Sequence, residues 1–259
     1  MKPGILVISH GSREAEWVRL VDRAVEAAAA SPLVHSVPVY SSFLEIVEGR
    51  LIQDGIDALE EQGVTDLFVL PLFISSGSTH VDEIGQAFGL PPVAELEGDL
   101  GTFRVNARVH YGKPIDDDPD IAELLLSNIK PLSVQPEAET IMLIAHGSKE
   151  KVFHERWQHG LNELAERLRK LGGFAHSATA MLLPDQAANH LRALQAERPD
   201  ETVIVVPLFL SKGYFTNTVI PSRLKGLDYR YNGQAMLPHP AIERWLERRM
   251  ADWISEQLR

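Results

Sequence analysis

The sequence predicts an α/β protein of two similar halves, each a doubly wound parallel sheet, facing each other across a central cleft. Two repeated motifs indicate an internal duplication: His10-Gly-Ser recurs as His146-Gly-Ser, and Pro71-Leu-Phe recurs as Pro207-Leu-Phe, both offset by 136 residues. In addition, short apolar runs alternate with segments of helical spacing throughout the chain. This alternation predicts parallel strands joined by crossover helices.

The first half alternates strand and helix four times. Residues 5–9 are an apolar run ending at His10, and residues 13–30 carry apolar side chains at helical spacing, with Ser12 in position to be the N-cap. Residues 67–74 form a continuous apolar run, which is typical of a central strand buried on both faces. The remaining predicted elements are strands at 37–40 and 103–110 and helices at 47–61, 80–88 and 120–130.

A polar segment bracketed by prolines, residues 131–139, is predicted to link the halves. The two domains would then span residues 1–130 and 140–259. In the second half the same pattern predicts strands near 141–145, 176–181, 202–210 and 229–236, and a final helix over about 242–258.

Composition excludes several classes of function. A net charge of −11 disfavours a nucleic-acid partner, because phosphate binding requires a basic face. No apolar run approaches the roughly 20 residues of a membrane span, and the N-terminal segment does not resemble a signal peptide, so we expect a cytoplasmic protein. The absence of cysteine excludes thiolate chemistry and limits any protein-held metal to nitrogen and oxygen ligands.

Three polar residues follow successive predicted strands of the first half: His10, Glu45 and His80. The carboxyl ends of parallel strands meet at one edge of a sheet, where ligands of such folds bind. Two imidazoles and a carboxylate at that edge favour an open site for a divalent ion such as Co²⁺, Fe²⁺, Ni²⁺ or Zn²⁺. The same imidazoles could instead accept protons at neutral pH.

Each of these residues alone also has an ordinary structural explanation. His10 could help to cap the following helix, Glu45 could be a solvated residue at a helix start, and His80 could be an N-cap or surface residue. Their joint placement favours function. The 136-residue offset equates Glu45 with Met181 and His80 with Thr216, so the second half keeps only His146 and is predicted to have lost the site.

At these motifs the chain resembles the class II chelatases of the sirohydrochlorin cobaltochelatase and ferrochelatase type (CbiX/SirB-like), in their two-half form. The resemblance rests on the opening strand with His10-Gly-Ser-Arg13, on Ser42-Phe-Leu-Glu45, on Pro71-Leu-Phe running into Gly77 and His80-Val81, and on the tandem of two halves. It spans nearly the whole chain.

The resemblance implies an enzyme, a lyase that inserts Co²⁺ or Fe²⁺ into sirohydrochlorin without ATP, in siroheme or cobalamin biosynthesis. It implies that His10 and His80 bind the incoming metal and assist removal of pyrrole protons, with Glu45 as a further ligand or proton acceptor. No cofactor is expected beyond the substrate metal, which could also be Ni²⁺. A carrier that binds metal or tetrapyrrole without turnover is the alternative.

A substrate rich in carboxylates calls for polar and basic residues near the site. Arg13, Ser12, Lys149 and Lys212 lie on predicted loops at the edge of the sheets and are the candidates for substrate binding. A hydrolase is disfavoured, because the Gly-x-Ser-x-Gly nucleophile motif is absent. The partners expected are thus the tetrapyrrole and the metal, with no nucleic acid and no membrane, and the duplicated chain could be self-sufficient as a monomer.

Overall fold

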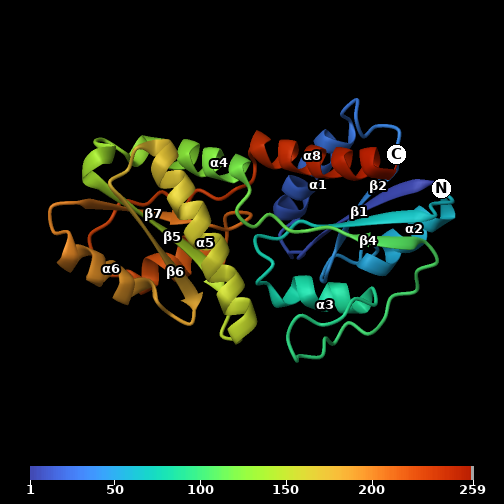
Figure 1. Cartoon of the computed structure of the whole chain (residues 1–259), viewed down its shortest axis with the longest axis horizontal. Helices are drawn as coiled ribbons and strands as arrows, with labels where there is room; N and C mark the ends of the chain where they lie inside the picture. Colours follow the sequence, from blue (N-terminus) through green and yellow to red (C-terminus); the bar gives the residue numbers. More distant parts are fainter. Residues whose placement is uncertain (258–259) are drawn as a thin grey trace. The chain divides into compact units, whose positions relative to one another are not determined.

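The computed structural model describes residues 1–257 and divides them into two compact units (Figure 1). Unit 1 comprises Met1–Ile115 together with the C-terminal segment from Ile242, and unit 2 comprises Asp116–Ala241. Each unit contains one fully parallel sheet, of four strands in unit 1 and three in unit 2. The predicted fold class, two parallel-sheet α/β domains, is confirmed.

In unit 1 the strand order is β2-β1-β3-β4, which places the first and third strands at the centre. The apolar character of these two strands explains their position, because a central parallel strand is covered on both faces. β3 is buried along its whole length. The four strands are β1 (Pro3–Ser9), β2 (Val39–Phe43), β3 (Asp66–Pro71) and β4 (Arg108–Tyr111).

Helices cover both faces of this sheet. Ile56 and Ile84, from α2 and α3, pack in one apolar cluster with strand residues such as Leu6. On the opposite face the Trp253 ring of α8 stacks on Phe68, with ring centroids 5.1 Å apart and planes 9° apart, and Figure 1 shows α1 on the same side as α8. The helices are α1 (Ala15–Ala29), α2 (Ile52–Glu61), α3 (Thr79–Ala87) and α8 (Pro240–Gln257).

The start of α1 differs from the prediction. The helix begins at Ala15 with Glu14 as its N-cap residue, so Ser12 is not the N-cap. The Ser12 hydroxyl instead accepts a hydrogen bond of 3.1 Å from the Glu14 backbone N–H. This local turn, two residues long, is a common alternative for serine and delays the first helical turn.

Unit 2 has a smaller sheet, of order β6-β5-β7. Ile144 and Val205 of this sheet share an apolar cluster with Leu191 of α6 and Ile220 of α7, while α5 packs against β5 and β6 and also against α4. The elements are α4 (Pro119–Ile129), β5 (Glu139–Gly147), α5 (Lys151–Gly172), β6 (His176–Leu183), α6 (Ala187–Glu197), β7 (Thr202–Pro207), a π-helical turn (Phe215–Val219) and α7 (Ile220–Arg223), with short 3₁₀ turns at Lys130–Leu132 and Pro136–Ala138.

The strand predicted at 229–236 is wrong. Arg230 forms only an isolated bridge with Ile204 at the edge of the sheet. The chain then turns away, because Gly233 adopts a positive φ of 64° and the Asn232 side chain accepts a hydrogen bond from the Gln234 N–H. An Asn-Gly pair of this kind favours a turn over a continuing strand.

The two units also differ from the predicted domains of 1–130 and 140–259. α4 follows β4 in the chain but belongs to unit 2, and α8 follows unit 2 but belongs to unit 1. Asn128 anchors α4 in unit 2 by donating its side-chain N–H to Ala235 O at 2.9 Å. The chain passes between units near residues 115 and 241, and Leu258, in the last turn of the predicted final helix, lies outside the described residues.

The predicted linker, 131–139, lies within unit 2 and is held there by a buried carboxylate. Glu139, 2% exposed, accepts hydrogen bonds from the Ser133 hydroxyl and from the Val134 and Gln135 N–H groups, and it pairs with Arg230 at 2.9 Å. Burial by itself would raise the pKa of Glu139, but these donors and the Arg230 charge outweigh it and lower the pKa. The segment is therefore a fixed turn.

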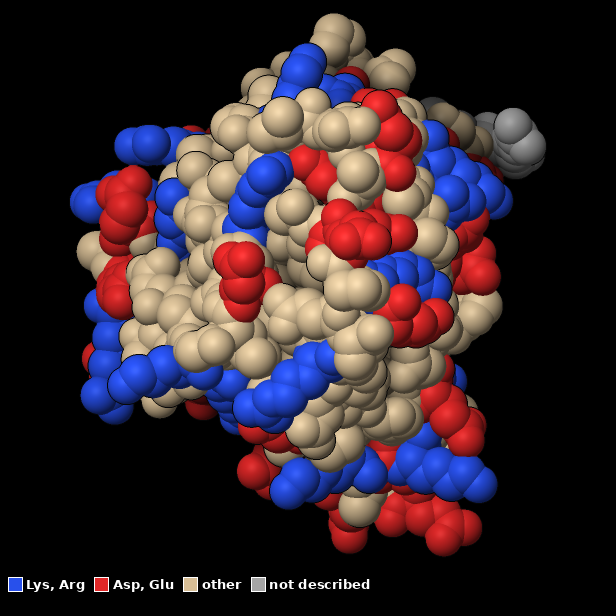
Figure 2. Space-filling model, turned by 90° about the vertical axis from the view of Figure 1, so that its left-hand side faces the viewer, with Lys and Arg blue, Asp and Glu red and all other residues tan. Residues whose placement is uncertain are grey.

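Charges of both signs are mixed on the face of the molecule that Figure 2 shows. Lysine and arginine side chains there have acidic side chains among them, which limits the extent of any single basic patch. No helix within residues 1–257 combines the length and the apolar character needed to cross a bilayer.

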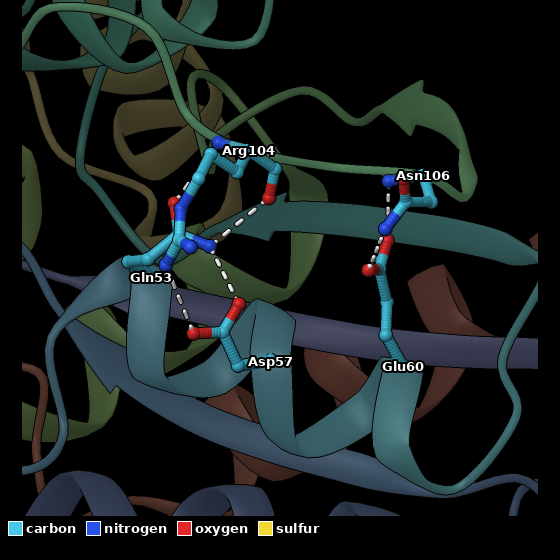
Figure 3. Close-up of polar contacts among 5 residues, drawn as sticks. All are labelled: Gln53, Asp57, Glu60, Arg104 and Asn106. Carbon is cyan, nitrogen blue, oxygen red and sulfur yellow. Dashed lines mark hydrogen bonds and ion pairs between the residues drawn. The ribbon is translucent and has the colours of Figure 1, made fainter.

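A ladder of polar contacts fixes the segment before β4 onto α2 (Figure 3). The Gln53 side-chain amide both donates to Arg104 O and accepts from Arg104 N, each at 3.0 Å. Two turns further on, the Glu60 carboxylate accepts from the backbone N–H groups of Asn106 and Ala107, at 2.5 and 2.9 Å, and from the Asn106 side chain at 2.7 Å. The helix thereby positions the chain as it enters β4.

The Glu60 contacts predict a stability that depends on pH. Burial alone would raise the pKa of Glu60, but the N–H donors of Ala107 and Asn106 outweigh it and lower the pKa below its ordinary value of 4.5. The stabilisation is then complete above pH 4.5 and is lost as the pH falls through the lowered pKa. Thermal unfolding from pH 3 to 7 should show Glu60→Gln destabilised by about 1–2 kcal/mol at neutral pH, with the difference vanishing in acid.

Asp57→Asn is the matched control for this measurement. Asp57 lies on the same helix and contacts the same segment, but its contact with Arg104 is 3.5 Å long and exposed. Such surface pairs contribute little, so we expect a change below about 0.5 kcal/mol. An equal effect of the two substitutions would show that the Glu60 hydrogen bonds are not what holds the segment.

Candidate functional site

Two neighbouring strands present His10 and Glu45 side by side. His10 follows β1, and the parallel pairing of β1 with β2 continues past the strand ends through Leu44 N–H to Ser9 O (2.8 Å) and Glu45 N–H to His10 O (3.1 Å). These backbone bonds fix the two residues at the carboxyl edge of the sheet. The predicted placement of both residues at this edge is confirmed.

The backbone around this pair is tightly constrained. Gly11 has a φ of 105°, and a Cβ atom on it would lie 2.1 Å from the carbonyl oxygen of Glu45. Ile46 has a φ of 74°, which is unusual for a β-branched residue. Such conformations cost roughly 1–3 kcal/mol each and are concentrated at functional sites. Only glycine permits the close approach that brings Glu45 beside His10.

His80 reaches the same edge from the loop after β3. It occupies the second position of α3, and the Tyr111 hydroxyl fixes this helix start by donating to Val81 O at 2.7 Å. The loop before it is closed by the Ser75 hydroxyl, which accepts from Gly77 N–H at 2.9 Å. β3, the Ser75–Gly77 turn and β4 together therefore hold His80 at the edge.

The two imidazoles are in contact, and each has its own carboxylate. The His10 and His80 rings meet edge to face, with centroids 4.9 Å apart and planes at 74°. The Nδ1 atom of His10 lies 3.6 Å from a Glu45 oxygen, and the Nδ1 atom of His80 lies 3.2 Å from a Glu83 oxygen. Both imidazole side chains are 41% exposed, so the pair is accessible to a ligand.

The predicted set of three metal ligands is not assembled as such. Within residues 1–257, no group of three or more His, Asp or Glu side chains is placed so that it could hold a metal ion. Glu45 and Glu83 lie against one imidazole each, where they can fix the ring orientation and leave the Nε2 atoms available. Glu83 was not predicted as a site residue, although its position three residues after His80 on a helix places it on the same face.

In unit 2 the corresponding positions are apolar, and the structure corrects two of the equivalences made from the sequence. Gly147 approaches Leu183 O as Gly11 approaches Glu45 O, so Leu183 rather than Met181 is the counterpart of Glu45. The Tyr231 hydroxyl donates to Thr216 O at 2.7 Å, as that of Tyr111 does to Val81 O.

The counterpart of His80 is therefore Phe215, one residue before Thr216. The His146 and Phe215 rings meet edge to face, with centroids 5.3 Å apart, as those of His10 and His80 do in unit 1. The constant offset fails because the two copies differ in length between the strands. Unit 2 has thus replaced Glu45 by a leucine and His80 by a phenylalanine.

The predicted substrate-binding residues lie on loops that follow strands. Arg13 is exposed between β1 and α1, Lys149 is exposed after β5, and Lys212 is exposed after β7. Ser12 is half-buried, and its hydroxyl is already engaged by Glu14. Substrate binding by these four residues stays a prediction.

Comparison with known proteins identifies relatives of both halves. The CbiX family model matches residues 4–132 and again residues 140–253. A sirohydrochlorin ferrochelatase of Bacillus subtilis is 31% identical over 155 residues, which are 58% of this chain but only 53% of that protein. The match therefore spans about half the length of that relative.

A shorter relative supports the duplication. A sirohydrochlorin cobaltochelatase of Methanopyrus kandleri is 26% identical over 137 residues, 94% of its length and 49% of this chain. Nearly the whole of that protein thus corresponds to about half of this one.

The fold has solved counterparts as well. The structure of SirB from Bacillus subtilis with Fe³⁺ superposes with a TM-score of 0.76 at 24% identity, covering 99% of this chain and 98% of that one. The family model matches residues in nearly all of both halves, and the fold of the SirB structure extends over 99% of the chain. This chain therefore belongs to the CbiX family.

Proposed function

We propose that this protein is a sirohydrochlorin chelatase, which inserts Co²⁺ or Fe²⁺ into the tetrapyrrole without ATP and without a cofactor beyond the metal substrate. The observation that carries the proposal is the exposed contact between His10 and His80, each with a carboxylate at its Nδ1 atom. Imidazole nitrogens suit these borderline divalent ions. The named activities of two relatives, one a ferrochelatase and one a cobaltochelatase, agree with this ligand type.

The partners of the Nδ1 atoms determine which nitrogen of each ring is available. For His80 the hydrogen-bond partner is Glu83 at 3.2 Å; for His10 it is the Gly11 carbonyl oxygen at 3.3 Å, with the Glu45 carboxylate 3.6 Å away. A carboxylate next to Nδ1 favours the tautomer with the proton on that atom, which leaves the Nε2 lone pair free. The incoming ion is held by the two Nε2 atoms. Two neutral ligands bind a divalent ion more loosely than a closed structural site, so the ion can leave for the macrocycle.

The His10–Glu45 and His80–Glu83 pairs also account for the protons that the macrocycle releases. Insertion of one divalent ion replaces two pyrrole N–H protons, so two protons must be accepted for each ion transferred. As the ion leaves, both Nε2 atoms become free and take up these protons. The carboxylates of Glu45 and Glu83, 3.6 and 3.2 Å from the Nδ1 atoms, attract the positive charge of the resulting imidazolium ions.

An anaerobic absorbance assay tests the function directly. Purified protein is mixed with metal-free sirohydrochlorin and with Co²⁺, Fe²⁺ or Ni²⁺ in turn, and the spectral change on metallation is followed. We expect many turnovers per protein molecule, at rates that rank the three metals. Stoichiometric binding of metal or tetrapyrrole, with an insertion rate no higher than the uncatalysed control, would show that the protein is a carrier and not a chelatase.

Glu83→Gln should lower kcat about 10–100-fold, the usual effect of changing a residue that orients a metal-binding histidine. The amide keeps the shape of the side chain but places no negative charge beside the Nδ1 atom of His80. Glu48→Gln, on an exposed carboxylate of the loop after β2, is the matched control. A wild-type kcat in folded Glu83→Gln would show that Glu83 does not orient His80 for metal insertion.

A further inference from the structure

Unit 2 carries an exposed aromatic cluster at the edge of its sheet. The rings of Phe209 and Phe215 are stacked, with centroids 5.4 Å apart and planes 15° apart. Tyr214 meets Phe215 at 5.8 Å, and His146 meets it edge to face from the end of β5. Tyr214 is 69% exposed and Phe215 is 36% exposed. We call these four residues the aromatic platform.

The platform is held by specific contacts. Thr216, only 1% exposed, accepts a hydrogen bond at its hydroxyl from Gly213 N–H at 3.0 Å, and its carbonyl accepts one from Tyr231 at 2.7 Å. These bonds fix the backbone on the C-terminal side of Phe215. An exposed phenylalanine on a fixed backbone loses little conformational entropy when a ligand binds to its ring.

The backbone at the platform is a π-helical turn, Phe215–Val219, whereas the matching segment of unit 1 is an ordinary α-helix. Single π-helical turns are rare, and they occur frequently at functional sites. This turn begins at the residue that replaces His80. The same position that presents a metal-type ligand in unit 1 presents an aromatic ring in unit 2.

Two lysines lie on the loops that carry the platform residues, although the chain as a whole has a net charge of −11. Lys149 lies three residues after His146, and Lys212 lies two residues before Tyr214. Both are exposed, on the loops that follow β5 and β7. Exposed aromatic rings, with lysines on the loops that carry them, suit a ligand that is planar, conjugated and rich in carboxylates.

We propose that the aromatic platform of unit 2 is a binding site for the tetrapyrrole, which stacks one face of its macrocycle on Phe215 and Tyr214 and directs carboxylates toward Lys149 and Lys212. The proposal rests on the proposed function, since it takes the same substrate. Where unit 1 has the imidazole of His80, unit 2 has the ring of Phe215, which can stack on the macrocycle. The degenerate copy is thus a substrate-binding unit.

Binding of metal-free sirohydrochlorin tests the proposal without turnover. The absorbance change of the macrocycle is titrated with the full-length protein and with Phe215→Ala, Phe215→Leu and Phe215→Tyr. We expect the dissociation constant to rise about tenfold in Phe215→Ala and Phe215→Leu, the usual loss for one stacked ring, and to stay near wild type in Phe215→Tyr. Co²⁺ titrated alone should bind all four proteins equally.

Two further variants keep the test decisive if a Phe215 variant is poorly folded. Tyr214→Ala removes a ring that is 69% exposed, and it should weaken binding several-fold without lowering Tm. Lys212→Ala should weaken binding and reduce its dependence on salt. If Phe215→Ala and Tyr214→Ala are folded and bind sirohydrochlorin with wild-type affinity, while the wild-type protein metallates it, the binding role of the aromatic platform is overturned. The proposed chelatase function would still stand. No metallation by wild type would instead overturn the proposed function.

Discussion

His80→Ala is expected to abolish metal insertion while the protein stays folded. The substitution removes one of two imidazoles that meet at the edge of the unit 1 sheet, 4.9 Å apart between ring centroids. It deletes both a metal ligand and a proton acceptor, so the loss of kcat should reach about 10²–10⁴-fold. The side chain is 41% exposed, and the helix start remains fixed by the Tyr111 hydroxyl. We therefore expect the unfolding midpoint to change little.

The internal duplication supplies the control for this measurement. His146→Ala removes the histidine of the same motif in unit 2, where the neighbour is Phe215 instead of a second imidazole. A lone imidazole without a carboxylate partner is not expected to deliver metal, so the insertion rate at saturating tetrapyrrole should fall far less than in His80→Ala. Equal rates in the two variants would contradict the assignment of the metal site to unit 1.

Gly11→Ala should cost both stability and activity. Its Cβ atom would lie 2.1 Å from Glu45 O on a backbone with a φ of 105°, so the β1 and β2 ends must separate. The strain and the clash together should destabilise unit 1 by roughly 2–6 kcal/mol. A shift of His10 relative to Glu45 by about 1 Å should in addition lower kcat about 100-fold. Chemical denaturation and the insertion assay measure the two effects.

Gly101→Ala separates the clash from the backbone conformation. Gly101 also has a positive φ, 69°, but nothing lies within 4 Å of the Cβ position. Its cost should be about 1–2 kcal/mol, from the left-handed conformation alone. If Gly11→Ala and Gly101→Ala were equally stable and equally active, the close approach to Glu45 would have no role in forming the site.

The unit 1 sheet could be predicted from local patterns. Its central strands are continuous apolar runs, His10 directly follows β1, and His80 lies at the start of the helix after β3. The rule that ligands bind at the carboxyl edge of a parallel sheet was therefore enough to place both residues. The exchange of α4 and α8 between the units could not be predicted in this way. Both helices have one apolar side, and nothing in that pattern specifies which sheet will bury it.

The details of the site depended on packing that spacing alone does not encode. Glu83 was missed because a carboxylate one turn after a histidine is common on helix surfaces. The counterpart of His80 was predicted at Thr216, one residue after its true counterpart Phe215, because a fixed offset ignores the length changes that loops tolerate well. The hydroxyl of Tyr231, anchored on Thr216, reveals the true alignment.

Because α4 belongs to unit 2 and α8 belongs to unit 1, a single cut in the chain cannot separate the two units. A fragment that ends at residue 130 would keep a helix that belongs to unit 2 and would leave Phe68 without Trp253. Such a truncation exposes apolar surface and is prone to aggregate. A circular permutant that joins the segment from Ile242 to Met1 and ends at Ile115 would instead contain every helix of unit 1 in one continuous polypeptide. The boundaries of the repeated halves in the sequence and the boundaries of the compact units in the structure therefore fall at different points of the chain.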